Sequence, residues 1–318
     1  MKIVKLISKM KLLIITLFVI NSSFVFASDS YDKAEQKIDR IRIAAGDLLD
    51  GYYMIGLRLC RYISNSNDGL RCEVVPTSGS YENLTLLREG KVDYAFSISN
   101  MAFDSYQGKG QFKTNGPFED LVQLLKLHDV YFTVLSKDKD QIITFKDLEG
   151  KKISNGPPFS DSSKVYNEIF KLYDFKQNPV DVEVLYENYA KRYCAGEIDA
   201  LMILTGHPSA LINIITNKCE SDFVSMDRKK LDRFVESNKM FSRKKLKKGS
   251  YIGITEDQET VATRAIFVTN KKKNAKITQN FLNYLSVRLQ QLKLSDEVLN
   301  NLDVSDFLKD FVLPGFNN

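Results

Sequence analysis

The sequence predicts a mixed α/β fold made of two units of similar design. Short apolar strands alternate with amphipathic helices along residues 40–97, and the same alternation returns along residues 147–209. This rhythm is typical of a mainly parallel sheet with helices against its faces. With 318 residues, of which 43% are hydrophobic, the chain can fill the cores of two domains of ordinary size.

The first unit begins with a strand over residues 40–45, followed by a polar loop at 46–51. Apolar spacing then predicts the elements up to residue 97, and two more apolar segments follow before a charged turn at 137–140. We expect His128, between those two segments, at a transition from helix to strand. The predicted elements are a helix over 53–63, a strand over 72–76, a helix from 80 to 87, a strand over 92–97, and apolar segments at 121–127 and 130–135.

The second unit begins with a turn that leads into a strand over residues 147–154, and the breaker cluster Asn155–Pro158 ends that strand. The run of basic residues at 239–248 is interpreted as a solvated loop. The remaining expected elements are helices over 160–173, 186–195, 275–294 and 295–309, a helix opened by residues 205–209, strands over 182–185 and 198–203, and an extended segment over 259–268.

The N-terminus has the layout of a cleavable secretory signal. Four lysines precede a nine-residue apolar run at 12–20, and a small-residue pattern ends at Ala27. A membrane-spanning helix needs ~20 apolar residues, so the anchor alternative is weaker. We expect a signal peptide at 1–27, a polar leader at 28–39, and a soluble mature protein in the periplasm. A lipid anchor is not expected, because no cysteine lies near the cleavage point.

The charge of the chain excludes one class of partner. The formal charge is +5, but four of the lysines belong to the signal, which leaves about +1 on the mature chain. A near-neutral surface provides no electrostatic footprint for nucleic acid. We therefore expect no nucleic-acid partner.

Four cysteines fit an exported protein. Cys60 and Cys72 are twelve residues apart, and Cys194 and Cys219 are twenty-five apart. Two disulfides are expected in an oxidising compartment, and three connectivities are possible, of which local pairing is favoured. A metal site is not expected, because there is no CxxC spacing and the chain has two histidines.

No catalytic motif is present. The sequence lacks GxSxG, HExxH, P-loop and GxGxxG patterns. His128 is interpreted as a structural residue, and His207, just before Pro208, as a residue that can line a cleft. Neither has a recognisable nucleophile beside it, and oxidised cysteines supply no thiolate. We expect no enzyme activity and no cofactor.

Three polar turns carry the functional signal. They lie at residues 77–80, 159–163 and 205–208, and each follows a predicted strand and precedes a predicted helix. Ligands bind at the carboxyl ends of strands in α/β sheets, and a helix N-terminus suits an anionic group. Serine and threonine are also ordinary helix caps, so any one turn has that simpler interpretation. Three such turns, divided between two units, favour a site for a small polar molecule.

Several short motifs add a family resemblance. Gly51-Tyr52-Tyr53 ends a loop, and Thr77-Ser78-Gly79-Ser80 is followed by Asn83. Residues 145–158 and 196–200 contain DLEGKKI, NGPP and GEIDA, and Gly206-His207-Pro208 follows. In this order and spacing, over about residues 40–270, they resemble the TAXI-type solute-binding proteins of tripartite ATP-independent periplasmic (TRAP) transporters.

The resemblance implies a two-lobed periplasmic binding protein of type II, the Venus flytrap fold. Lobe I would comprise residues 40–135 and 262–318, and lobe II residues 136–261. The protein would pass a small, carboxylate-bearing, glutamate-like molecule to ion-gradient-driven TRAP permease subunits, and it would contact the membrane through that permease alone. Cysteines at matching places in some members support the local disulfide pairing. The implied ligand-binding residues are Gly51, Tyr52, Tyr53, Thr77, Ser78, Gly79, Ser80, Asn83, Ser99, Asn100, Ser160, Ser162, Ser163, Thr205, Gly206, His207 and Pro208.

Two departures from the family pattern leave the ligand open. The first loop reads Gly-Asp-Leu-Leu-Asp-Gly, so Asp47 and Asp50 add negative charge near the expected site. Asp161 stands within the Ser-Gly-Thr segment of the family, where it could simply cap a helix. A ligand with a cationic group, or a smaller ligand, therefore becomes possible. Alternative functions are a ligand sensor or a secreted antigen on the same fold, without a transport role.

Overall fold

The computed structural model describes residues 40–48, 51–137, 141–273 and 275–295. The predicted signal peptide, the polar leader and residues 296–309 of the last predicted helix lie outside this range. Asp50 of the first loop also lies outside it.

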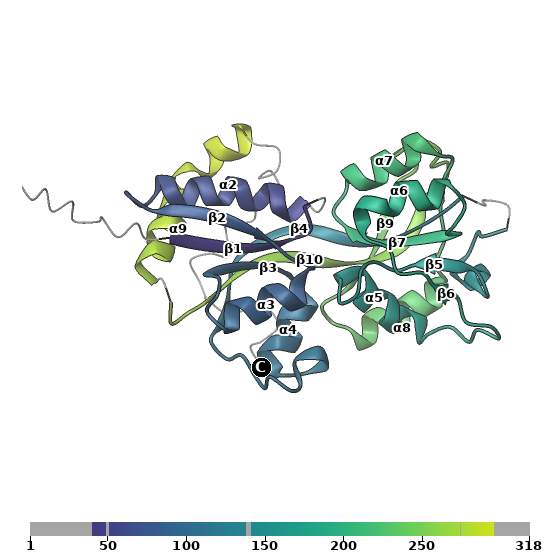
Figure 1. The fold of residues 1–318 in the computed structure, drawn as a ribbon, viewed down its shortest axis with the longest axis horizontal. Coiled ribbons are helices and arrows are strands. Elements are labelled where there is room, and N and C mark those ends of the chain that lie inside the picture. Colours follow the sequence, from purple (N-terminus) through teal and green to yellow (C-terminus); the bar gives the residue numbers. More distant parts are fainter. Residues whose placement is uncertain (1–39, 49–50, 138–140, 274, 296–318) are drawn as a thin grey trace, which may run out of the picture. The chain divides into compact units, whose positions relative to one another are not determined.

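Ten strands form one sheet within the described residues (Figure 1). Most of them coincide with the apolar segments of the sequence, and the mixed α/β class is confirmed. The strands are β1 (Arg40–Gly46), β2 (Arg71–Pro76), β3 (Tyr94–Ile98), β4 (Leu121–Ser136), β5 (Lys152–Ser154), β6 (Val180–Asp181), β7 (Ala200–Thr205), β8 (Asp222–Phe223), β9 (Ser242–Leu246) and β10 (Gln258–Asn270).

The helices follow the strands in alternation. Two short 3-10 helices lie at Gly110–Phe112 and Phe145–Leu148. The α-helices are α2 (Gly51–Asn65), α3 (Ser80–Arg88), α4 (Ser99–Gln107), α5 (Asp161–Phe170), α6 (Tyr186–Cys194), α7 (Ala210–Lys218), α8 (Arg228–Ser237) and α9 (Ala275–Ser295).

The strand order divides the sheet into two sets of parallel strands. The order is β2-β1-β3-β10-β4-β7-β5-β6, with β8 beside β4 and β9 beside β10. Strands β1, β2 and β3 are mutually parallel, as are β5, β6 and β7. We call the first set, with α2, α3 and α4, the N-terminal half, and the second, with α5, α6 and α7, the central half.

Two long antiparallel strands join these halves. Strand β4 pairs with β10 along Leu121–Tyr131 and with β7 along Tyr131–Ser136. Strand β10 pairs with β9 through Gln258–Ala262 and with β3 through Ala265–Thr269. The β4–β10 pair therefore links the halves, because β10 bonds to β3 of the N-terminal half and β4 bonds to β7 of the central half.

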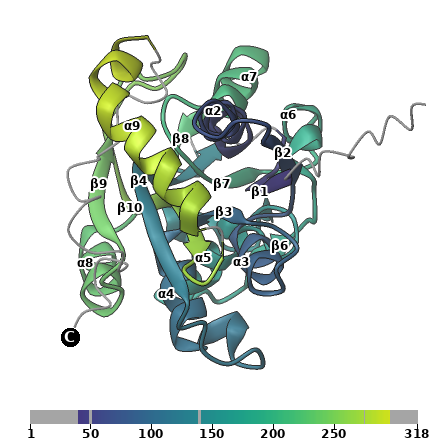
Figure 2. The same cartoon turned by 90° about the vertical axis from the view of Figure 1, so that its left-hand side faces the viewer.

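Helices cover both faces of the sheet. In Figure 1, α2 lies on the opposite face of β1 from α3 and α4, and α6 and α7 lie on the opposite face of β7 from α5. Helix α9 packs against α2, and Figure 2 shows it across the end of the sheet nearest to β1 and β10. A large apolar cluster extends from β1 to α5, and a smaller one lies between β7, α6 and α7.

Several sequence predictions were wrong in detail. His128 lies inside the continuous strand β4, and no helix ends there. The basic run at 239–248, expected as a loop, contains strand β9, which pairs with β10. The strand expected at 182–185 is instead the two-residue β6 just before it. Helices α4 and α8 were not predicted.

Candidate ligand-binding site

A small cavity lined by both polar and apolar residues lies where loops of the two halves meet. Its space for water-sized molecules is about 20 Å³, enough for about one water molecule. It lies beside the carboxyl ends of parallel strands, where α/β sheets bind ligands. The lining residues are Asp47, Tyr52, Ser78, Gly79, Ile98, Val130, Ser160, Asp161, Tyr186 and Leu204.

Ser80 and Asp161 connect the two halves directly. The Ser80 hydroxyl donates to Oδ2 of Asp161 at 2.7 Å and accepts the backbone N–H of Ile98 at 3.0 Å. Both capacities of this buried hydroxyl are therefore used within the protein. Gly79 has φ 133°, a backbone conformation that residues with a side chain rarely adopt, so the turn before α3 favours glycine at this position.

Two further contacts join the same elements. The Phe159 ring faces the Tyr81 ring of α3 with centroids 6.1 Å apart, although Phe159 is 63% exposed and has φ 64°. Lys164 of α5 lies 3.5 Å from the Asp104 carboxylate of α4. The start of α5 thus contacts α3 and α4 through a hydrogen bond, an aromatic pair and an ion pair.

The loop after β2 is fixed by hydrogen bonds within the N-terminal half. Thr77 Oγ1 accepts the backbone N–H of Gly46 at 2.9 Å and donates to Oδ1 of Asn83. The Asn83 amide in turn donates to the Phe96 carbonyl at 2.9 Å. Ser78 lines the cavity, and its hydroxyl donates to Glu82 at 2.8 Å. Thr77 and Asn83 therefore hold the loop in place, although neither residue lines the cavity.

The serines at the start of α5 serve mainly local structure. The Ser160 hydroxyl accepts the backbone N–H of Ser163, which makes Ser160 the N-cap of the helix. The Ser162 hydroxyl lies 2.8 Å from the Tyr186 hydroxyl and accepts the backbone N–H of Leu204. Of these three serines, Ser160 lines the cavity.

His207 forms a polar network with Thr133 and Tyr251, and none of these three residues lines the cavity. Its Nε2 lies 3.0 Å from the Thr133 hydroxyl and its Nδ1 lies 2.6 Å from the Tyr251 hydroxyl. A Cβ on Gly206 would lie 2.5 Å from the His128 ring, so this glycine allows that ring to pack close. Neither histidine lines the cavity.

The predicted ligand residues therefore separate into two groups. Four of them line the cavity: Tyr52, Ser78, Gly79 and Ser160. Ser99 instead bonds Thr263 of β10, and the Asn100 amide oxygen accepts from the same threonine. The others outside the lining are Gly51, Tyr53, Thr77, Ser80, Asn83, Ser162, Ser163, Thr205, Gly206, His207 and Pro208. The sequence reasoning did not select Ile98, Val130, Asp161, Tyr186 or Leu204.

The cavity has a negative electrostatic character. Two carboxylates, Asp47 and Asp161, line it, and no lysine, arginine or histidine is among its described lining residues. Burial raises the pKa of Asp161 to about 6, against the opposing effect of the hydrogen bonds from Ser80. Burial lowers the pKa of His128 and of His207 to about 4, so both imidazoles are neutral at pH 7.

These pKa shifts predict how stability depends on pH. The stabilisation associated with the neutral histidines is present above pH 6.5 and is lost as the pH falls through about 4. Asp161 acts in the opposite sense, because its contribution is complete below pH 3.8 and is lost as the pH rises through about 6. Urea unfolding between pH 6.5 and 4 should show a steeper loss of stability in Asp161→Asn than in the parent. Equal slopes would contradict the raised pKa of Asp161.

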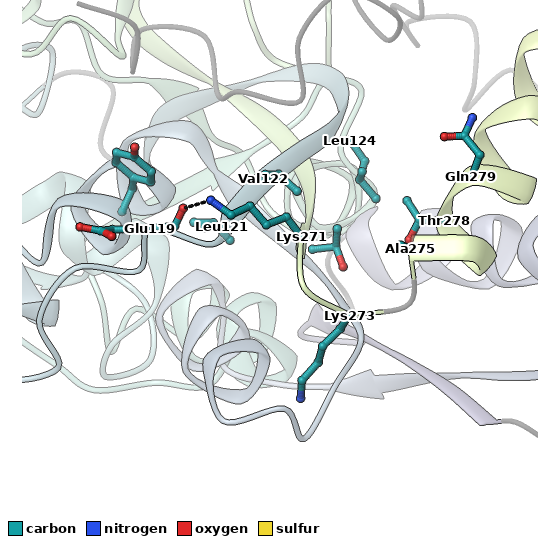
Figure 3. Close-up of a pocket in the computed structure, with 11 residues that line it drawn as sticks. Glu119, Leu121, Val122, Leu124, Lys271, Lys273, Ala275, Thr278 and Gln279 are labelled. Atoms are coloured by element: carbon teal, nitrogen blue, oxygen red, sulfur yellow. Dashed lines mark hydrogen bonds between the residues drawn. The ribbon is translucent and has the colours of Figure 1, made fainter.

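A second, larger cavity has a different character. Its volume is about 480 Å³, and it lies between the start of β4, the end of β10 and the start of α9 (Figure 3). Lys271 donates there to the backbone carbonyl of Glu119 at 3.2 Å. It contains none of the predicted ligand residues and lies away from the polar turns after β2 and β5. We therefore place the candidate site at the smaller cavity.

The cysteines form two disulfides. Cys60 is bonded to Cys72, joining α2 to β2, and Cys194 is bonded to Cys219, joining the ends of α6 and α7. This is the local connectivity. Within the described ranges, no group of three or more potential ligands is arranged to hold a metal ion. No helix there is both long enough and apolar enough to span a membrane.

Comparisons with known proteins give a family and several structural neighbours. The profile of the NMT1-like family matches residues 43–314. The periplasmic aliphatic sulphonate binding protein SsuA of Escherichia coli is similar at 14% identity and TM-score 0.46, over 82% of this chain and 77% of that one. The alkanesulfonate-binding protein SsuA of Xanthomonas axonopodis pv. citri bound to MOPS is similar at 14% identity and TM-score 0.47, over 84% of this chain and 81% of that one. The amino acid ABC transporter substrate-binding protein AbpA of Streptococcus pneumoniae bound to L-arginine is similar at 14% identity and TM-score 0.47, over 84% of this chain and 94% of that one.

Proposed function

Because the chain belongs to the NMT1-like family, we propose that it is a solute-binding protein that captures a small polar molecule outside the cytoplasmic membrane. The observation that carries this proposal is the cavity at the strand ends, to which both halves contribute polar residues. Hydroxyl, phenol and carboxylate groups from separate elements converge there. The absence of recognisable nucleophile–base motifs in the sequence agrees with a binding role.

The proposed mechanism is closure of two lobes around the ligand. The lobes would comprise residues 40–135 with 262–318, and residues 136–261. Contacts such as Ser80–Asp161 and Asp104–Lys164 are the kind expected of a closed state. Since the cavity has room for about one water, a larger ligand requires these loops to separate before it enters.

The finer proposal concerns the transport partner and the ligand. The motif resemblance supports delivery to a TRAP permease driven by an ion gradient. It also supports the periplasm as the location, reached through the signal at residues 1–27, and a carboxylate-bearing, glutamate-like ligand. The proposed contacts to the ligand come from the cavity-lining residues Tyr52, Ser78, Gly79 and Ser160.

Two measurements test the proposed function. Native mass spectrometry of the purified protein, followed by thermal unfolding with amino acids and small carboxylates, should reveal a bound molecule or a Tm that rises with ligand concentration. Uptake of that ligand by cells should stop when the ion gradient is collapsed and continue when ATP alone is depleted. Binding without any uptake would favour a sensor, and the absence of binding would contradict the proposal.

A further inference from the structure

One carboxylate oxygen in the cavity has no hydrogen-bond partner among the described protein groups. Oδ1 of Asp161 is closed off from solvent, whereas Oδ2 accepts the hydrogen bond from Ser80. A buried polar atom without a hydrogen-bond partner destabilises the folded protein, and more so when the group is charged. Asp161 also lines the cavity, so the unsatisfied oxygen belongs to a residue of the site.

The charged groups around Asp161 indicate which charge a ligand in the cavity should carry. The other charged lining group is the Asp47 carboxylate, and the described lining provides no cationic side chain. Lys164, one turn along α5, forms ion pairs with Glu168 at 2.9 Å and with Asp104 at 3.5 Å. An anion entering the cavity would therefore face two carboxylates without a compensating cation from its lining.

The N-terminus of α3 also disfavours an anionic ligand. Helix N-termini attract anions, and this one already receives the Asp161 carboxylate through Ser80. Asp161 therefore takes, from within the protein, the position that the carboxylate of an anionic ligand would need. Tyr52 and Tyr186 also line the cavity, and tyrosine is a residue type whose ring can attract a cation.

We infer that the ligand carries a protonated amine, which donates a hydrogen bond to Oδ1 of Asp161. This inference rests on the proposed solute-binding function and narrows its ligand class to amines and amino acids. A ligand carboxylate is compatible with it only in a zwitterion, whose ammonium group faces Asp161. A charge-assisted hydrogen bond in a closed cavity is about twice as strong as a neutral one, so Asp161 becomes the main determinant of specificity.

The test uses pairs of compounds that differ only by an amino group. Glutarate is compared with L-glutamate, propionate with β-alanine, and putrescine serves as an amine without a carboxylate. Calorimetric titration of the purified full chain should detect binding of at least one amine and of neither plain carboxylate. Asp161→Asn should weaken the amine at least tenfold, because the ammonium group would then face a neutral amide oxygen and lose the attraction of the opposite charge.

A matched control separates the loss of charge at the site from a general loss of negative charge. Asp232→Asn removes one carboxylate from the exposed ion pair between Asp232 of α8 and Arg243 of β9, and should leave amine affinity unchanged. Binding of glutarate or propionate by the parent, undiminished in Asp161→Asn, would overturn the inference while the solute-binding function stands. Binding of none of the five compounds at millimolar concentration would count against both the inference and the proposed function.

Discussion

Replacing Phe267 with alanine is expected to lower the free energy of unfolding by about 3–5 kcal/mol. Phe267 is fully buried on β10, with its ring centroid 5.4 Å from that of Tyr94 and 5.0 Å from that of Phe96. Deleting the ring removes these contacts and leaves a cavity that the surrounding strands can fill only in part. Urea denaturation followed by circular dichroism measures the change.

The same substitution should also weaken ligand binding. Phe96 stacks on the cavity-lining Tyr52 at 5.3 Å, so Phe267 supports the site through one intervening ring. Val287→Ala is the matched control, because Val287 is 84% exposed and its truncation should change stability by no more than about 0.5 kcal/mol. A loss below about 1 kcal/mol in Phe267→Ala would contradict the described core.

Much of the fold could be predicted from residue patterns. Short apolar segments such as β1 and β3 are buried along their length or on one face, and both have strong sequence signals. The start of α5 also follows from local chemistry, because Ser160 caps it. Local propensity and tertiary environment agree at these places, so the pattern alone is sufficient.

The misassigned elements are those whose state depends on distant partners. Strand β9 reads SRKKL and has no apolar alternation, yet it pairs with β10, and its lysines reach Asp129 and Glu259. Lysine on an edge strand also protects it from pairing with other chains. Strand β4 is long because it pairs with β10 over its first part and with β7 over its last part, and nothing local in its sequence shows where it should end.

The candidate site was predictable as a region and not as a set of atoms. The turns after β2 and β5 could be located, since Ser, Thr and Gly cluster there. The sequence could not show that the Ser80 hydroxyl accepts from Ile98 and donates its one proton to Asp161. It also could not show that Asp161 reaches across to α3, because this contact joins residues 81 positions apart.

Removing the Cys194–Cys219 bridge is expected to destabilise the protein by about 3.5 kcal/mol, because it closes the longer loop in the unfolded chain. The double variant Cys194→Ser, Cys219→Ser should unfold at lower guanidinium concentration than the parent. Cys60→Ser with Cys72→Ser is the matched comparison and should lose about 3 kcal/mol, since its loop spans 12 residues. Parent protein unfolded in a reductant should lose both contributions, and insensitivity to reductant would contradict the prediction.

The double variant Cys194→Ser, Cys219→Ser should lose stability without losing ligand affinity. The bridge holds the last residue of α6, whereas Tyr186, the first residue of that helix, contacts Ser162 and lines the cavity. Seven residues of helix lie between Cys194 and Tyr186, and the hydroxyl contact between Tyr186 and Ser162 does not depend on the bridge. Amine affinity measured where the variant is still fully folded should therefore match that of the parent within about twofold, since sites without shared contacts act almost independently. A tenfold loss would mean that the bridge positions α6 as a whole, and that Tyr186 depends on both ends of its helix.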